Sequence, residues 1–160
     1  MKTIQNQVDM ERKEILQEIK KYFTVKELVC NHTYNKFGES SWQFLDTKAL
    51  HTLLVLRRDL FKTPMVVNYS GHYQRGLRCN LCQLVKDKTN RNAVYLTAHI
   101  LGKAFDISMK TITGAQARDM IKKNQDLLPY PVRIEKDVNW LHIDVRDTHN
   151  DNRKVIEVNG

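Results

Sequence analysis

The sequence predicts an α+β fold in which helices flank a small, mostly antiparallel sheet. Segments with a helical period begin at capping residues, and short apolar or β-branched runs between polar turns are typical of strands. These segments do not alternate as in a regular parallel βαβ fold, which favours α+β. With 160 residues, the chain is long enough to bury a core, and we treat residues 1–160 as one domain.

Capping residues and apolar spacing place the expected helices. They are residues 7–22, a short turn opened by the capping box of Thr24 and Glu27, a long helix from the N-cap Asp46 to Pro64, and a helix from Thr113 to about Leu127. Residues 31–44 are expected to form a loop. The long segment 72–97 is interpreted as a functional loop, with or without a short helix near residues 81–86.

β-branched and aromatic runs place the expected strands at residues 65–69, 105–107, 131–135, 140–145 and 155–158. The predicted organisation is an N-terminal helix within residues 1–22, a core from 23 to 146, and a C-terminal extension from 147 to 160.

The net charge of +8 favours polyanionic partners, either nucleic acid or an anionic cell-envelope polymer. Since the chain has no recognised nucleic-acid motif or stacking platform, we expect no specific nucleic-acid partner. It also has no apolar run long enough for a membrane span and no apolar stretch of a secretory signal peptide near Met1.

The three cysteines cannot all pair with one another within the chain, so reduced thiols are expected. Cys79 and Cys82 form a CxxC motif that, with Cys30 and His32, could supply four ligands to a structural zinc ion. Because free cysteine is also a small buried hydrophobe, and only one CxxC is present, we prefer that second interpretation.

His99 and His142 lie in segments whose residues could form a metal site. Two imidazoles and one carboxylate form the ligand set of a catalytic zinc site with an open fourth position, and Asp106 follows His99 closely. Taken alone, each histidine fits a structural role better than a role as a metal ligand.

Several motifs occur in an order that resembles a known family: Phe23 to Leu28, Tyr69-Ser70-Gly71, His99-x-x-Gly102-x-Ala104-x-Asp106, and Trp140-x-His142-x-Asp144. The chain resembles the zinc D-alanyl-D-alanine carboxypeptidases and L-alanyl-D-glutamate endopeptidases, a group that includes phage endolysins and virion-associated lysins. The resemblance runs from about Phe23 to Val145. It implies the hedgehog/DD-peptidase fold and hydrolysis of peptide bonds in bacterial peptidoglycan.

The resemblance implies that His99, Asp106 and His142 bind one Zn²⁺ ion, which activates the attacking water. The best-studied family members have an acidic residue three positions before the last ligand, where this chain has Asn139. Other branches of the family resemble this chain in having an acidic residue at the end of the preceding strand, so Glu135 is our first candidate for the general base and Asp137 the second. Asp144 shares a strand face with His142 and could orient it.

An arginine that steadies the substrate is also implied by the resemblance, which places it shortly after Ser70-Gly71. Because the present segment is longer, either Arg75 or Arg78 could take this role, and we place Arg75 slightly ahead.

The expected partner is a peptidoglycan peptide, and other virion proteins are a further possibility. The expected location is the host cytoplasm before lysis, or the virion. Asn139 motivates an alternative hypothesis, a structural virion protein that keeps the peptidase fold without catalysis. A basic nucleic-acid module is the third hypothesis.

Overall fold

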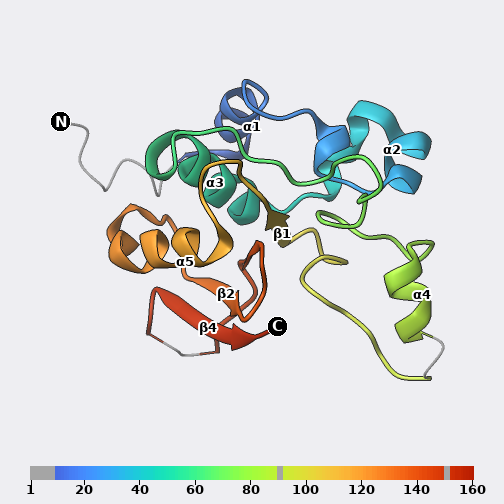
Figure 1. Cartoon of the computed structure of the whole chain (residues 1–160). Helices are drawn as coiled ribbons and strands as arrows, with labels where there is room; N and C mark the ends of the chain where they lie inside the picture. The colour runs from blue at the N-terminus through green and yellow to red at the C-terminus, as the bar shows by residue number, and fades with distance from the viewer. Residues whose placement is uncertain (1–9, 90–91, 150–151) are drawn as a thin grey trace.

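The computed structural model describes residues 10–89, 92–149 and 152–160. Within these residues the fold is mixed, with five α-helices and an open, mostly antiparallel four-stranded sheet (Figure 1). The elements are α1 (Arg12–Ile19), η2 (Val25–Glu27), α2 (Asn31–Phe37), η3 (Gly38–Phe44), α3 (Thr47–Val55), η4 (Leu56–Leu60), α4 (Gln83–Thr89), β1 (Ala104–Ile107), α5 (Gly114–Lys123), η5 (Gln125–Leu127), β2 (Val132–Lys136), β3 (Leu141–Asp144) and β4 (Val155–Asn159). The prediction of an α+β fold is confirmed at this level.

The sheet has the strand order β1-β3-β2-β4. β3 is antiparallel to both β1 and β2, whereas β4 adds to the edge of β2 in parallel. The C-terminal extension therefore contributes an edge strand to the sheet. In the β1–β3 register Phe105 lies opposite Ile143 and Asp106 lies opposite His142. One face of this pair is apolar and the other is polar, because neighbouring residues of a strand point to opposite faces.

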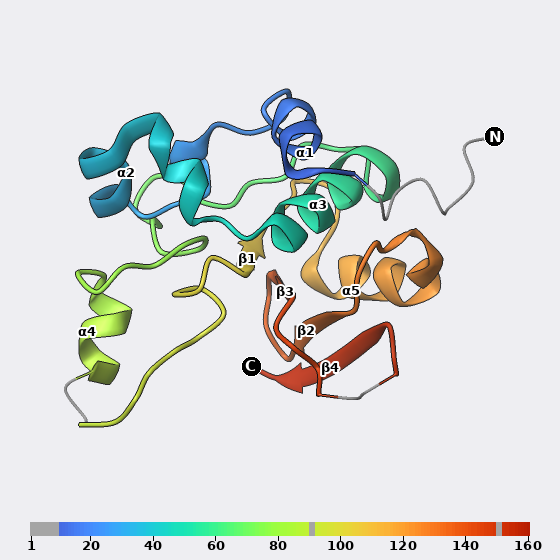
Figure 2. The ribbon, with the colours of Figure 1, turned by 180° about the vertical axis from the view of Figure 1, so that it is seen from behind.

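The helices gather around one large apolar cluster. α1 packs against α3, and both contribute to the cluster together with α5 and the apolar face of the sheet. Figures 1 and 2 show α4 and α5 on opposite sides of the molecule, with α4 set apart from the helices that cover the core. None of the described helices is long and apolar enough to cross a bilayer.

Three of the four predicted helix starts are confirmed. Asp46 accepts a hydrogen bond of 3.1 Å from the backbone amide of Ala49, and Thr113 and Gln116 form a reciprocal capping box. Thr24 and Glu27 form another, although it opens only a short 3₁₀ turn. The predicted N-terminal helix is shorter than expected, since α1 begins at Arg12 and the residues before Met10 lie outside the described part.

Two predicted elements are wrong. Residues 31–44 form α2 and η3 rather than a loop, because Thr33 and Trp42 are buried and Phe37 packs edge-on against Phe44. Residues 65–69 form isolated bridges rather than a strand. There, the Asn68 side chain donates a 2.7 Å hydrogen bond to the carbonyl of Val29. A side-chain hydrogen bond thus stands where a strand would have backbone hydrogen bonds to its neighbour.

His51 is fully buried on α3, although its position in the sequence indicates a surface or boundary residue. Its Nδ1 lies 3.3 Å from the hydroxyl of Tyr130, and its Nε2 has no hydrogen-bond partner among the described residues. Burial, aided by the nearby charge of Arg58, lowers the pKa of His51 below 6.5. The folded protein therefore favours the neutral ring.

As the pH falls from about 7.5 to about 5.5, His51 should lower the free energy of unfolding, because the unfolded chain takes up the His51 proton first. The stabilisation that the neutral His51 ring provides is complete above pH 6.5, the ordinary pKa of histidine, and is lost as the pH falls below that value. The raised pKa of His142 acts in the opposite direction, so the role of His51 shows in the difference between variants. In chelator-treated protein, denaturant titrations at the two pH values should show that acidification is less unfavourable to the free energy of unfolding of His51→Asn than to that of the wild type. The exposed-residue control His149→Asn should keep the wild-type pH dependence, and equal pH dependence in all three proteins would contradict this role.

Gly102 joins the turn that carries His99 to β1. Its φ is +68°, and a Cβ atom there would overlap the carbonyl oxygen of Phe44. The sequence suggests that Gly102 allows a close approach to the strand that carries Asp106, but the close neighbour is the backbone of η3. Gly71 also has a positive φ, +82°, yet its Cβ would meet nothing within 4 Å.

The substitution Gly102→Ala should destabilise the fold more than Gly71→Ala. Backbone strain alone costs about 1–2 kcal/mol, or about 2–8 °C in Tm for a chain of this size. The overlap with Phe44 adds to that strain only at Gly102. Thermal unfolding of the two variants should therefore place Gly102→Ala clearly below Gly71→Ala, and similar Tm values would show that the backbone of η3 yields.

Candidate metal centre

His99 enters the site from the turn before β1. Its side chain is buried, and its Nδ1 lies 2.8 Å from the carbonyl oxygen of Gly76. Because a carbonyl oxygen can only accept, Nδ1 carries the proton of the neutral ring and Nε2 keeps its lone pair. Nε2 faces Asp106, with 3.4 Å between Nε2 and Oδ2. The backbone thus selects the tautomer that presents Nε2 to the site.

Asp106 and His142 meet across β1 and β3. The Oδ1 atom of Asp106 lies 2.8 Å from Nδ1 of His142, and both side chains are buried. Burial raises the pKa of Asp106, but hydrogen bonds with His142 and His99 outweigh it and hold this pKa well below its usual range. Asp106 is therefore an ionised carboxylate between two imidazoles.

Asp144 contacts the opposite nitrogen of His142, with 3.0 Å between Oδ2 and Nε2. Arg133 donates two hydrogen bonds of 2.9 Å to the carboxylate of Asp144. Burial raises the pKa of Asp144, but its bonds with His142 and Arg133 lower it to about 2. Asp144 is thus placed to hold the proton of Nε2, which leaves Nδ1 of His142 directed at Asp106.

His142 lies between two carboxylates. Burial lowers its pKa, but the hydrogen bonds with Asp106 and Asp144 raise it to about 9. Binding of a cation at Nδ1 must displace a proton there, so metal binding and proton release are coupled at this site.

His99, Asp106 and His142 could hold a metal ion. One ligand atom of each lies within 4.8 Å of the ligand atoms of the other two, and all three side chains are buried. Two nitrogens and one carboxylate oxygen fit a divalent transition metal, and three protein ligands leave a coordination position open. The structure therefore brings together the three residues that the resemblance implies as ligands.

This triad borders a cleft of about 310 Å³. Glu135 lines the cleft, and its Oε1 lies 3.8 Å from Nδ1 of His142. Arg78 also lines it, and its Nη2 lies 3.3 Å from Oδ2 of Asp106. A half-buried acid and a guanidinium therefore lie on the same open side of the triad.

Arg75 and Asp137 do not line this cleft. The Arg75 guanidinium donates hydrogen bonds to the carbonyl of Val67 at 2.9 Å and the hydroxyl of Ser108 at 2.7 Å. Asp137 is exposed in the turn after β2, with a φ of +64°. Of each predicted pair, the structure thus places Arg78 and Glu135 nearer the triad.

The cleft also contains residues that the sequence did not mark as part of a site. They include Tyr95, Arg133, Trp140 and Arg146. Arg133 could have been found from the two-residue alternation of the strand, because it shares a face with Glu135. The sequence indicates core packing for Trp140, whereas its half-buried ring lines the cleft. Tyr95 and Arg146 lie outside regular elements, where no periodic signal exists.

The chain matches no protein-family model, no curated protein and no solved structure in the comparisons with known proteins. The assignment of this site therefore depends on the geometry and chemistry of its own residues.

Replacing Asp144 should weaken metal binding, and it should do so only through its effect on His142. We expect Asp144→Asn to reduce zinc affinity about 10–100-fold, because a metal-bound histidine depends on the partner of its other nitrogen. Competition with a chromophoric chelator, in a Cys82→Ser background that removes a thiol donor, would measure this change. Asp147→Asn, at an exposed carboxylate, should leave the affinity unchanged. Equal affinities would contradict the orienting role of Asp144.

Proposed function

We propose that the chain is a zinc-dependent peptidase that hydrolyses a peptide bond in bacterial peptidoglycan stem peptides, as a phage-type lysin with the hedgehog/DD-peptidase fold. The observation that carries the proposal is the buried triad of His99, Asp106 and His142 beside an open cleft that Glu135 and Arg78 also line. The ordered motifs that resemble the peptidoglycan peptidases support the same conclusion.

Zinc fits the donor set, since two imidazole nitrogens and one carboxylate are common ligands of catalytic zinc. When bound, zinc supplies a Lewis acid that polarises a carbonyl and lowers the pKa of a water. The chain's own contribution is to hold three ligands on one side, through the carbonyl of Gly76 at His99 and the carboxylate of Asp144 at His142.

Glu135 is the general base in this proposal. It is half-buried, lines the cleft and lies within 4 Å of a ligand nitrogen, so a water between it and the triad is within reach. Its carboxylate takes a proton from that water and delivers a proton to the leaving amine. Asn139 cannot perform this step because an amide does not accept a proton at neutral pH.

Arg78 is placed to bind substrate. Its guanidinium lies at the triad, and Arg133 and Arg146 also line the cleft. Because Arg133 is paired with Asp144, Arg78 and Arg146 are the guanidinium groups that could meet the carboxylates of a stem peptide. A planar guanidinium can donate paired hydrogen bonds to a carboxylate or to the oxyanion that forms during hydrolysis.

Glu135→Gln should lower turnover of purified peptidoglycan about 10²–10⁴-fold, because the variant keeps the shape of the side chain but cannot accept the proton. Zinc content should remain that of the wild type. Asp137→Asn, two residues further on in the turn after β2, is the matched control and should keep wild-type turnover. Turbidity loss and elemental analysis of each protein provide the two measurements.

A structural virion protein that keeps the fold without catalysis is the second candidate, favoured by Asn139. The two candidates differ in one result. Lysis by the wild type that is abolished by chelation and by His99→Ala supports the peptidase, whereas bound zinc without lysis supports the structural role.

A further inference from the structure

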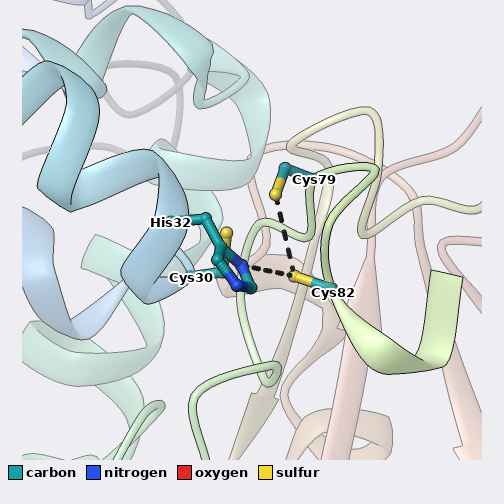
Figure 3. A group of neighbouring side chains, drawn as sticks. All are labelled: Cys30, His32, Cys79 and Cys82. Atoms are coloured by element: carbon teal, nitrogen blue, oxygen red, sulfur yellow. Dashed lines mark hydrogen bonds between the residues drawn. The ribbon is translucent and has the colours of Figure 1, made fainter. Parts of the chain in front are cut away.

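A second group of metal-binding side chains lies outside the cleft. It consists of Cys30, His32, Cys79 and Cys82, which we call the Cys3His cluster. Cys30 and His32 come from the start of α2, and the other two come from the segment that leads into α4 (Figure 3). His32 and Cys82 are 50 residues apart in the chain, so only tertiary structure brings them together.

The distances within the cluster suit one tetrahedral ion. All four ligand atoms lie within 4.8 Å of one another. The Sγ atoms of Cys79 and Cys82 are 4.0 Å apart, and Nδ1 of His32 lies 3.9 Å from Sγ of Cys82. Zinc–sulfur bonds of about 2.3 Å at tetrahedral angles would separate two sulfurs by about 3.8 Å. All three cysteines are free thiols in the structure.

The surroundings of the cluster show what a metal would accomplish. The apolar group at this place contains three buried residues, Cys30, Cys82 and Val85, among those the structure describes. Leu81 and Leu84 beside them are about half exposed. So small a core does little to offset the conformational entropy lost when residues 78–89 become ordered. A metal cross-link from α2 would supply the missing stabilisation, as structural zinc does in small domains.

We propose that the Cys3His cluster binds a structural zinc ion that ties α4 and the segment before it to α2. Four protein ligands leave no open coordination position, which distinguishes this site from the triad in the cleft. The backbone amide of Leu81 donates a hydrogen bond of 3.4 Å to Sγ of Cys79, which helps to hold that sulfur in place in the cluster. The preferred interpretation of the sequence, that free cysteines are small buried hydrophobes, does not account for the partly exposed Cys79 or for His32.

The cluster is connected to the cleft through its neighbour in sequence. Arg78 directly precedes Cys79, its amide donates to the carbonyl of His99 at 3.2 Å, and its side chain reaches Asp106. A zinc ion at the cluster would therefore also hold Arg78 at the cleft. The catalytic use of Arg78 depends on the function proposed above, whereas metal binding by the cluster does not.

Metal analysis of the full chain, purified under reducing conditions, tests the site directly. We expect about two zinc ions per wild-type chain, and about one in either Cys82→Ser or His99→Ala. Cobalt substitution identifies the donors, because only the cluster can give thiolate-to-cobalt charge-transfer absorption. That absorption should persist in His99→Ala and vanish in Cys82→Ser.

A substitution at an exposed residue excludes the possibility that zinc is lost because the variant misfolds. His32 is exposed, so His32→Asn should fold normally yet lose one zinc ion per chain or bind it more weakly, while His149→Asn, at another exposed histidine, should bind zinc as the wild type does. Hydrogen exchange gives an independent readout. The amides of Val85 and Lys86, which bond to the carbonyl of Cys82, should exchange faster after chelation.

The outcomes separate the two sites. One zinc ion that is lost in His99→Ala and kept in Cys82→Ser would overturn the cluster site, as would a Cys79–Cys82 disulfide in freshly purified protein without metal. One zinc ion that is lost in Cys82→Ser and His32→Asn but kept in His99→Ala would support the cluster site and contradict the metal centre of the proposed function.

Discussion

The cross-strand contact between Asp106 and His142 is the interaction on which the site depends. It exists because β1 and β3 pair in one register, in which Phe105 and Ile143 enter the core from the opposite face. A slip of one residue would turn the apolar pair outward and the polar pair inward. Core packing thus sets the register, and the register places a carboxylate against an imidazole.

Each buried charged side chain around this contact lies next to a side chain that can carry the opposite charge. His142 lies between Asp106 and Asp144, and Arg133 neutralises the far end of the series with two hydrogen bonds. Loss of one member of such a network leaves an uncompensated buried charge, which costs about 3–5 kcal/mol. The complete network therefore makes His142 rigid and presents one nitrogen to the cleft.

Residues 76–78 connect the two groups of candidate metal ligands. The carbonyl of Gly76 binds the His99 ring, and the amide of Arg78 binds the His99 carbonyl. Between them, Leu77 pairs with Val29, next to Cys30 at the start of α2. Backbone groups that a regular strand would give to its neighbours are used here to join a turn, a helix and the cleft. Because these backbone groups bond to several different elements, the apolar residues of this stretch follow neither a helical nor a strand period.

Local signals in the sequence determined the helix starts at Asp46 and Thr113 and most of the strands, because capping and side-chain alternation act over a few residues. The order of motifs also singled out His99, Asp106 and His142. Tertiary contacts decided what has no local pattern: the helices within residues 31–44, the burial of His51, the proximity of Glu135 and Arg78 to the triad, and the gathering of the Cys3His cluster. Each of these depends on segments distant in sequence, and their approach is set by packing of the whole core.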